Sequence, residues 1–280
     1  MNYLFLFTKQ SLILDFRFFF TSRWLLSQKV EFILKKYLIL IYHMFRKFQL
    51  GKDFTVLSGR KIYYANKFGI ADYQGMLTRH QSLLKIAGVK VKRDGVIVDV
   101  GANVGIFSRL VRELYPKASV YSLEPVPDIF ACLGKNFLQD QNIKIFNIAL
   151  GNRKGKHKMF FSNQNSEMSK IDTKGNVSVN VDTLDNFIKE NKVKLIDLLK
   201  IDTEGFEQIV LEGAVRTLAK TRYLFIEIAI EDNKNYTISS LMSHLCSDDF
   251  NFNLVAFRNF ADTSEGKAPI LDCLMRNVKL

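Results

Sequence analysis

The sequence predicts an α/β fold: a mainly parallel sheet with helices on both of its faces. Short runs rich in β-branched and aromatic residues, such as 96–100 (VIVDV) and 223–228 (YLFIEI), alternate along the chain with amphipathic runs of helical spacing. Strands that alternate with helices of about 10–15 residues are typical of βαβ units, whose strands pair in parallel. No segment of about 20–50 residues repeats, which excludes a solenoid.

Composition supports an ordinary globular protein. The 280 residues are 48% apolar and 24% charged, which excludes a disordered, collagen-like or multi-span membrane protein. The three cysteines, Cys132, Cys246 and Cys273, lie far apart and form no CxxC pair, so neither a disulfide framework nor a zinc site is indicated. A reducing, cytoplasmic compartment is therefore the simplest expectation.

The net charge of +12 is distributed unevenly. Residues 1–50 hold eight Lys or Arg and two acids, whereas the other 230 residues hold 32 bases and 26 acids. A nucleic-acid-binding protein more often spreads its positive charge over one folded face. We therefore expect no nucleic-acid partner.

The first 50 residues form a segment of their own, rich in Leu and Phe and interrupted by basic residues. Their longest uncharged stretch, 37–45, is too short to span a bilayer, and no signal-peptide pattern is present. We predict a basic amphipathic helical extension over 1–50, followed by a single catalytic domain over 51–280. Two interpretations of the extension stay open: a helical cap packed on the domain, or a segment that lies on an anionic membrane surface. The oligomeric state is not predicted.

Local signals then place the elements of the domain in order. Ser58 and Gly59 between two short strand-like runs indicate a hairpin, Gly88 and Pro116 end helices, and the polar tract 162–174 predicts a surface loop. We expect strands at 54–57, 61–64, 96–100, 120–123, 143–149, 158–161, 177–181, 196–201, 223–228, 254–257 and 270–275, and helices at 73–87, 104–115, 128–138, 182–189, 206–218 and 238–246.

The strongest motif, 99–105 (DVGANVG), joins the strand 96–100 to the helix that follows. A glycine turn that enters a helix presents free backbone N–H groups, which bind anions. Gly101 permits close backbone approach and Gly105 permits tight packing of the helix on the strand. Asn103 tolerates the left-handed conformation that such loops usually assign to glycine. We therefore expect the loop to bind a cofactor through Asp99, Gly101, Ala102, Asn103 and Gly105.

The loop differs from common nucleotide motifs. Asn103 breaks the GxGxxG pattern, no P-loop Gly-Lys-Ser/Thr is present, and Asp99 would repel a pyrophosphate. An acid suits a ligand with an ammonium and a sulfonium, and S-adenosylmethionine has both. Glu124 closes the next strand, 23 positions after Gly101, where an acid can accept hydrogen bonds from ribose hydroxyls. Pro125 turns the chain beside it and is included in the expected cofactor site.

Four stretches resemble the FkbM-type methyltransferases: 96–108 (VIVDVGANVGIFS), 121–127 (YSLEPVP), 179–188 (VNVDTLDNFI) and 198–214 (LLKIDTEGFEQIVLEGA). The resemblance covers residues 60–278 and does not reach the first 50. It implies a Rossmann-like class I methyltransferase with a seven-stranded sheet, S-adenosylmethionine as the methyl donor, and a hydroxyl on a sugar or polyketide-like molecule as the acceptor. It does not identify the acceptor.

Acidic residues follow several strands at the edge where an α/β sheet binds its ligands. A neutral hydroxyl is a poor nucleophile, so a base must remove its proton. Asp202 and Glu204 are the candidate catalytic residues; the alternative is that Asp202 caps a helix and Glu204 stabilises its first turn. Glu227 and His80 are the next candidates for the base. The four histidines have no metal-ligand spacing, so no metal is expected.

Two other functions stay open at this point. A nicotinamide-dependent dehydrogenase or epimerase could use a similar fold, although Asn103 breaks the glycine pattern of its cofactor loop. The chain could also be a non-catalytic module on a membrane surface. The leading expectation is an O-methyltransferase acting on a small molecule, a glycan or a glycolipid.

Overall fold

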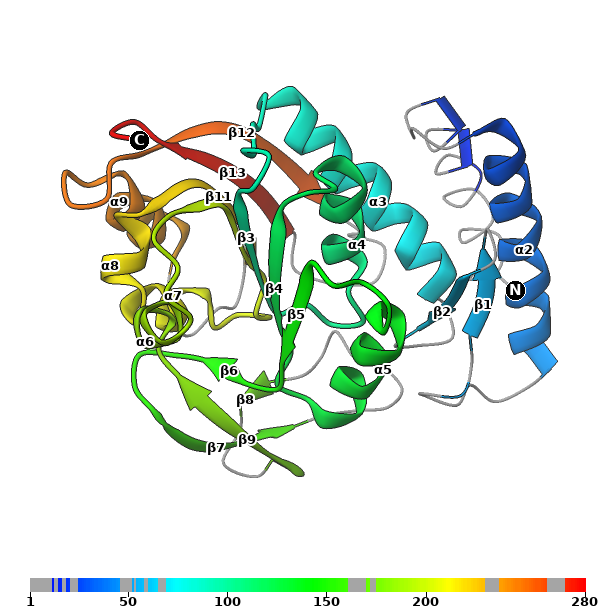
Figure 1. Cartoon of the computed structure of the whole chain (residues 1–280), viewed down its shortest axis with the longest axis horizontal. Helices are drawn as coiled ribbons and strands as arrows, with labels where there is room; N and C mark the ends of the chain where they lie inside the picture. Colours follow the sequence, from blue (N-terminus) through cyan, green and yellow to red (C-terminus); the bar gives the residue numbers. More distant parts are fainter. Residues whose placement is uncertain are drawn as a thin grey trace.

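The structure is a computed structural model that describes residues 12, 15, 16, 19, 20, 25–45, 52, 54–57, 60–64, 69–160, 170, 171, 175–229, 237–260 and 270–280. Its centre is a seven-stranded sheet of order β12-β13-β11-β10-β3-β4-β5 (Figure 1). The strands β11, β10, β3, β4 and β5 pair in parallel, and β13 and β12 are added antiparallel at one edge. This topology confirms the predicted Rossmann-like fold. The seven strands are β3 (Val96–Val100), β4 (Ser119–Leu123), β5 (Ile143–Phe146), β10 (Ile196–Ile201), β11 (Thr221–Ala229), β12 (Phe252–Phe260) and β13 (Ile270–Asn277).

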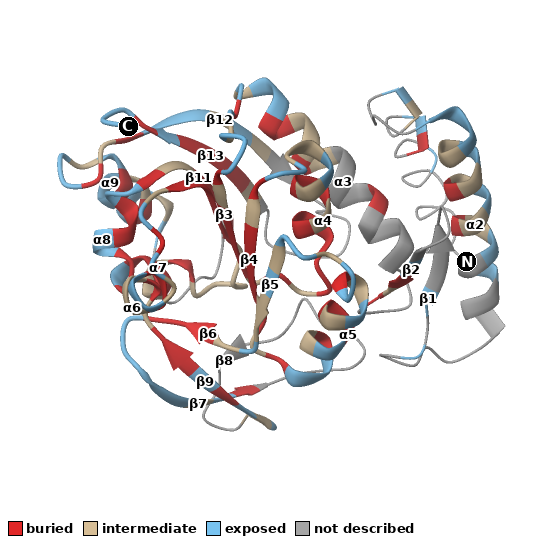
Figure 2. Ribbon diagram, in the orientation of Figure 1, coloured by how far each residue is buried: buried red, intermediate tan, exposed pale blue. Residues whose placement is uncertain are grey.

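Helices cover both faces of the sheet, as expected. One face carries α3 (Gly69–Ile86), α4 (Ile106–Leu114) and α5 (Pro127–Phe137), and the other carries α6 (Leu184–Glu190), α7 (Glu207–Glu212), α8 (Val215–Leu218) and α9 (Ile238–Cys246). Side chains of successive strand residues point to opposite faces. Ile97 and Leu198 accordingly pack under α3 and α4, whereas Val98 and Leu199 pack against the other helices. Figure 2 shows the burial that results along the central strands.

The N-terminal part packs beside the α3 face. It contains α2 (Leu26–Phe45) and an antiparallel hairpin of β1 (Phe54–Leu57) and β2 (Arg60–Tyr63). Figure 1 shows α2 at the outer side of this layer, with the hairpin and α3 between it and the sheet. The pairing of β1 with β2 confirms the predicted hairpin, and Ser58 and Gly59 themselves lie outside the described residues. Among the described helices, none is long and apolar enough to cross a membrane.

A second sheet was not expected. The run 143–149 was predicted as one strand, but it separates into β5 of the main sheet and β6 (Ala149–Leu150), which pairs with β9 (Val177–Asp182). β6 and β9 join β7 (Gly155–Phe160) and β8 (Lys170–Ile171) in order β6-β9-β7-β8. β8 interrupts the predicted loop 162–174, most of which lies outside the described residues. The helix predicted over 206–218 is likewise two helices, because α7 ends at Glu212, one residue before Gly213.

Candidate active site

The glycine loop follows β3 and lies against the loop that follows β10. Gly101, Asn103 and Gly105 all have positive φ angles, of 76°, 51° and 91°. Asn103 therefore adopts the left-handed conformation expected of it. A Cβ on Gly101 would overlap the carbonyl oxygen of Asp202, so the close approach is to the neighbouring loop. A Cβ on Gly105 would overlap side chains of α5, so its tight packing is against a helix and not against a strand as predicted.

Glu124 links this loop to the turn after β4. Its Oε2 accepts the N–H of Asn103 at 2.9 Å, and its Oε1 accepts the N–H of Val126 at 2.9 Å. The side chain of Asn147 donates to the carbonyls of Glu124 and Pro125, both at 2.9 Å, and so holds the turn. Glu124 is only 5% exposed. Burial raises the pKa of its carboxyl to about 7, against the opposing effect of the two backbone hydrogen bonds.

A buried lysine in β10 connects the candidate residues on the α3 face of the sheet. Lys200 lies opposite Asp99 in the register of β10 and β3, and it is 2% exposed. Its Nζ lies 2.9 Å from Asp202, 3.4 Å from Asp99 and 3.2 Å from the carbonyl oxygen of Gly101. Burial alone would lower the pKa of this ammonium, but Asp202 and Asp99 together raise it. Lys200 thus stays charged and holds three chain segments together.

Asp99 is fully buried, so its charge is compensated inside the protein. Its Oδ2 accepts the hydroxyl of Ser108 on α4 at 2.5 Å, and Ser108 also contacts the hydroxyl of Ser122 on β4 at 2.7 Å. We expected Asp99 to lie beside a cationic ligand, and the cation that the structure itself places beside it is the ammonium of Lys200.

Three carboxylates gather where β10 and β11 end. One oxygen of each of Asp202, Glu204 and Glu227 lies within 4.8 Å of the others. Burial and the nearby charges of Asp202, Glu204 and Asp272 raise the pKa of Glu227 well above its usual value. Oxygen donors of this kind suit divalent cations, although no metal was expected from the sequence. Lys200 already brings positive charge to Asp202, and we assign no metal site here. The raised pKa favours the protonated form of Glu227 beside the other two carboxyl groups.

The loop that carries Asp202 and Glu204 is stabilised by a residue that sequence reasoning overlooked. Oε1 of the buried Glu207 accepts the N–H groups of Thr203 and Gly205, at 2.9 and 3.1 Å. Glu204 and Gly205 adopt φ angles of 55° and 97° within this loop. The helix that follows begins only at Glu207, and its N-cap residue is Phe206. Asp202 is therefore not a helix cap and Glu204 is not in a first helical turn, which corrects the alternative interpretation of both.

Behind the cluster lies a buried pair formed by Asp272 of β13 and His80 of α3. Asp272 is opposite Glu227 in the register of β11 and β13, and its Oδ2 lies 3.9 Å from Nε2 of His80. Burial raises the pKa of Asp272 to about 7 and lowers that of His80 well below its usual value. His80 packs between Phe107 and Phe225, with ring centroids 5.6 and 4.9 Å away. It is a neutral core residue, which does not suit the role of a base open to an acceptor.

The structure thus brings the predicted residues to one edge of the sheet and adds Lys200, Ser108, Glu207 and Asp272 to them. Charged residues within largely apolar strands were the available signal: Lys200 in IDLLKI and Asp272 in ILDCLM. Such a residue must find a partner of opposite charge or a proton when it is buried. Ser108 and Glu207 gave no comparable signal.

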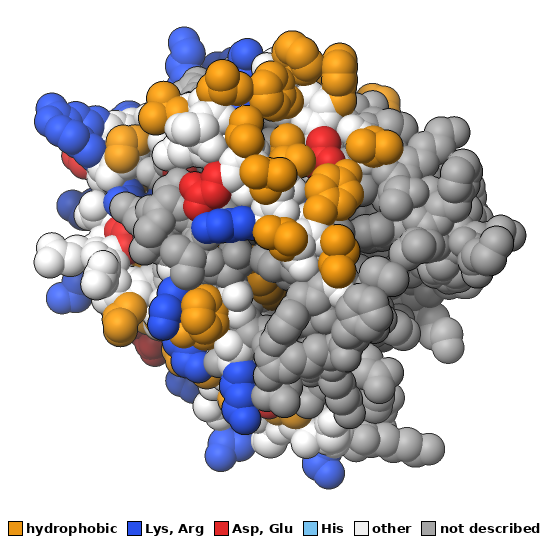
Figure 3. Space-filling view, turned by 90° about the vertical axis from the view of Figure 1, so that its right-hand side faces the viewer, with side chains coloured by type: hydrophobic (Ala, Val, Ile, Leu, Met, Phe, Trp, Pro, Cys, Tyr) orange, Lys and Arg blue, Asp and Glu red, His pale blue; other side chains and the backbone are white. Residues whose placement is uncertain are grey.

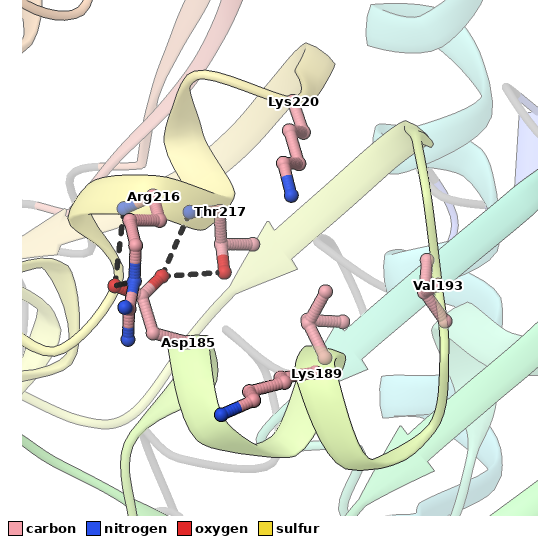
Figure 4. A pocket seen from close by; sticks show the side chains of 7 residues that line it. Asp185, Lys189, Val193, Arg216, Thr217 and Lys220 are labelled. Carbon is pink, nitrogen blue, oxygen red and sulfur yellow. Dashed lines mark hydrogen bonds and ion pairs between the residues drawn. The ribbon is translucent and has the colours of Figure 1, made fainter.

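A surface pocket of about 190 Å³ lies elsewhere, between α6 and α8 (Figure 4). Val193 and Lys220, which line it, precede β10 and β11, so the pocket is at the amino ends of these strands. Asp185 in its wall already accepts the N–H and the hydroxyl of Thr217, both at 2.7 Å. This pocket is therefore separate from the candidate active site at the carboxyl ends.

Comparison with known proteins adds the family. The methyltransferase FkbM domain matches residues 99–253, which include the glycine loop and the loop after β10. The chain is 28% identical to the 2-O-methyltransferase NoeI of Sinorhizobium fredii, over 70% of this chain and 85% of that protein. It is 26% identical to the hexuronic acid methyltransferase AglP of Haloferax volcanii, over 62% and 69% of the two chains.

Among solved structures, a crystal structure of methyltransferase FkbM from Methylobacillus flagellatus aligns with a TM-score of 0.47 and 13% identity. The alignment covers 86% of this chain and 59% of that one. The domain match spans more than half of the chain, and it decides between the functions that the sequence left open. The chain is a methyltransferase of the FkbM family.

Proposed function

We propose that this enzyme transfers the methyl group of S-adenosylmethionine to a hydroxyl oxygen of a sugar, a glycolipid or a polyketide-like small molecule. The observation that supports this best is the position of two acidic groups on one sheet edge. Glu124 contacts the glycine loop through Asn103, and the cluster of Asp202, Glu204 and Glu227 ends the strands on the other side of β3. A donor bound at the first group would meet an acceptor at the second.

The residues present fit S-adenosylmethionine. Glu124 is nine-tenths buried or more, and each of its carboxylate oxygens accepts one backbone N–H group, so it keeps lone pairs for two ribose hydroxyls. The first turn of α4 begins at Gly105 without a side-chain cap, so its N–H groups are available to a ligand carboxylate. We assign Gly101, Ala102, Asn103, Gly105, Glu124 and Pro125 to the cofactor site, with Asp99 supporting the loop through Lys200.

When bound, S-adenosylmethionine supplies an electrophilic methyl group. The protein must hold the acceptor hydroxyl in line with it and remove the hydroxyl proton. We assign proton removal to the carboxylates Asp202 and Glu204, with Glu227 sharing the proton because the three interact closely. Lys200 positions Asp202 and limits the negative charge that accumulates there.

The acceptor class rests on the relatives. NoeI is named as a 2-O-methyltransferase and AglP as a hexuronic acid methyltransferase, which supports a sugar hydroxyl as the first acceptor to test. We also propose that the catalytic domain comprises residues 51–280 and that residues 1–50 form an extension to it.

Calorimetry and activity test the proposal separately. S-adenosylmethionine and S-adenosylhomocysteine should bind and raise the melting temperature, whereas NAD and NADP should not. Radiolabelled S-adenosylmethionine incubated with fractionated glycans and lipids should then label an acceptor whose product resists mild base, as an ether does and an ester does not. Stabilisation by NAD alone, or labelling only as a base-labile ester, would contradict the proposal.

A further inference from the structure

The N-terminal helices pack on the rest of the chain through one defined face. Phe32 and Lys36 of α2 are completely buried. The Nζ of Lys36 contacts the carboxylate of Asp15 and donates to the side-chain oxygen of Gln74 on α3 at 3.0 Å. Asp15 also accepts the hydroxyl of Tyr37 at 2.6 Å. These contacts determine which side of α2 is turned inward.

The opposite side of the same helices is apolar and exposed. On α2, Leu26, Val30, Leu34, Leu38 and Ile41 follow one another at intervals of three or four residues, which places them on one stripe. At about 100° per residue this stripe is on the side away from Phe32 and Lys36. With the preceding residues it forms a surface, called here the outer face, whose members are 45–69% exposed: Leu12, Phe16, Phe20, Leu25, Leu26, Val30, Leu34, Leu38 and Ile41.

Figure 3 shows hydrophobic side chains gathered on this side of the molecule, with few Lys, Arg, Asp or Glu side chains of the described residues among them. Contiguous apolar surface on this scale marks an interaction site in a soluble protein. The alternation of basic and large apolar residues along 1–50 is typical of helices that lie in a membrane interface.

The charge of the segment identifies the partner. Residues 1–50 carry a net charge of +6, and both of their acids contact lysines of α2: Asp15 contacts Lys36, and Glu31 contacts Lys35 at 2.6 Å. The positive surplus is therefore not balanced within the segment. A second copy of the chain would bring the same surplus and be repelled, whereas an anionic lipid surface would attract it.

We propose that the outer face binds the surface of an anionic lipid bilayer, with α2 lying in the plane of the interface. Phe16, Phe20, Leu34 and Leu38 enter the boundary between head groups and acyl chains, and the surplus Lys and Arg of the segment contact the head groups. The buried face of α2 keeps its contacts with α3 in this arrangement, so capping and membrane binding are two functions of the same helix. This inference is independent of the acceptor and of the catalytic assignment.

Vesicle sedimentation of the full-length protein tests it. Binding is expected to vesicles of phosphatidylglycerol mixed with phosphatidylcholine, to weaken at high salt, and to be much weaker for pure phosphatidylcholine. The double variant Leu34→Gln/Leu38→Gln should reduce binding at least about tenfold, because it removes two apolar side chains from the interface. Glutamine has nearly the helix propensity of leucine, so α2 should persist.

Leu138→Gln is the matched control, since Leu138 is 85% exposed on α5 and lies outside the outer face. It should bind vesicles like the wild type. Trp24, the only tryptophan, belongs to the N-terminal segment, so its fluorescence gives a second, local signal that should shift on addition of anionic vesicles. The proposal is overturned if the wild type ignores anionic vesicles, if both variants bind equally, or if sedimentation velocity finds a dimer that only Leu34→Gln/Leu38→Gln dissociates.

Discussion

The carboxyl edge of the sheet and the outer face of the N-terminal helices depart from ordinary burial in opposite directions. At the sheet edge, charged groups such as Asp99, Lys200 and Glu124 are buried. At the outer face, large apolar side chains such as Phe16 and Leu38 are exposed. Each arrangement costs free energy in the isolated chain, the first through desolvation and the second through contact with water. The buried charges have partners within the chain, whereas the exposed apolar side chains are the surface for which we propose a lipid partner.

The largest expected effect comes from two buried lysines, Lys200 at the sheet edge and Lys36 on the inward side of α2. Lys200→Met removes the ammonium beside Asp99, which keeps the hydrogen bond from the hydroxyl of Ser108. Removing one member of a buried ion pair costs about 3–5 kcal/mol of unfolding free energy. Lys36→Met should cost less, because Asp15 still accepts hydrogen bonds from Tyr37 and Gln74.

Urea unfolding followed by circular dichroism measures both variants. We expect Lys36→Met to lower the free energy of unfolding less than Lys200→Met does. An equal or greater decrease for Lys36→Met would contradict the difference that their contacts indicate. Lys200→Met/Asp99→Asn, which removes both charges, should recover part of the loss.

The next effect is on turnover. Asp202→Asn and Glu204→Gln change the carboxylate cluster while preserving size, and at least one should reduce methyl transfer by about 100-fold or more, the scale of a lost general base. Affinity for S-adenosylmethionine should change little in that variant, and a higher pH should restore part of the rate. Steady-state kinetics with calorimetry separates these quantities. If both variants keep normal turnover, Glu227 is the base to examine; if both lose cofactor binding, the cluster belongs to the cofactor site.

Much of this edge could be predicted from the sequence, because it depends on local pattern. The loop DVGANVG is contiguous, and Glu124 follows it at a spacing set by one helix and one strand. The left-handed conformation of Asn103 also follows from local chemistry. The second sheet could not be predicted in this way, because separating β5 from β6 depends on the pairing of β6 with β9, about 30 residues away.

The role of Lys200 shows the same limit. Its partner Asp99 is a hundred residues earlier in the chain, and only the order of the strands brings the two side chains to one face. Local propensity carries no information on strand order. The outer face is the opposite case: its stripe is visible in the sequence, but only the burial of Phe32 and Lys36 establishes which side of α2 is turned outward.

A smaller effect is expected at Glu124, the residue that we propose binds the ribose. Glu124→Gln keeps the shape of the side chain but removes its charge, and it should weaken S-adenosylmethionine binding by roughly 1.5–3 kcal/mol, because hydrogen bonds to a charged acceptor are the stronger ones. Calorimetry measures the change. Glu190→Gln, an exposed carboxylate on α6, is the matched control and should bind like the wild type. Unchanged affinity in a folded Glu124→Gln protein would remove Glu124 from the site.

The smallest expected effect is the change of unfolding free energy with pH, to which the sheet edge should contribute and the outer face should not. Burial raises the pKa of Glu124 to about 7 from an ordinary value of 4.5, so the folded chain binds this proton more tightly than the unfolded chain. The contribution of Glu124 to stability is therefore complete below pH 4.5 and is lost as the pH rises to about 7. The slope is at most about 1.4 kcal/mol per pH unit. The raised pKa of Asp272 acts in the same direction.

Denaturant unfolding of the ligand-free protein between pH 5 and pH 7 measures this slope, and Glu124→Gln should reduce it. The ion pairs of α2 each join a lysine to a carboxylate, and burial lowers the pKa of Lys36. Leu34→Gln/Leu38→Gln should consequently leave the slope unchanged, since it alters no charge. A slope that is equal in Glu124→Gln and the wild type would mean that the buried carboxyl does not carry this proton. A slope altered by the leucine variant would mean that the two regions are coupled.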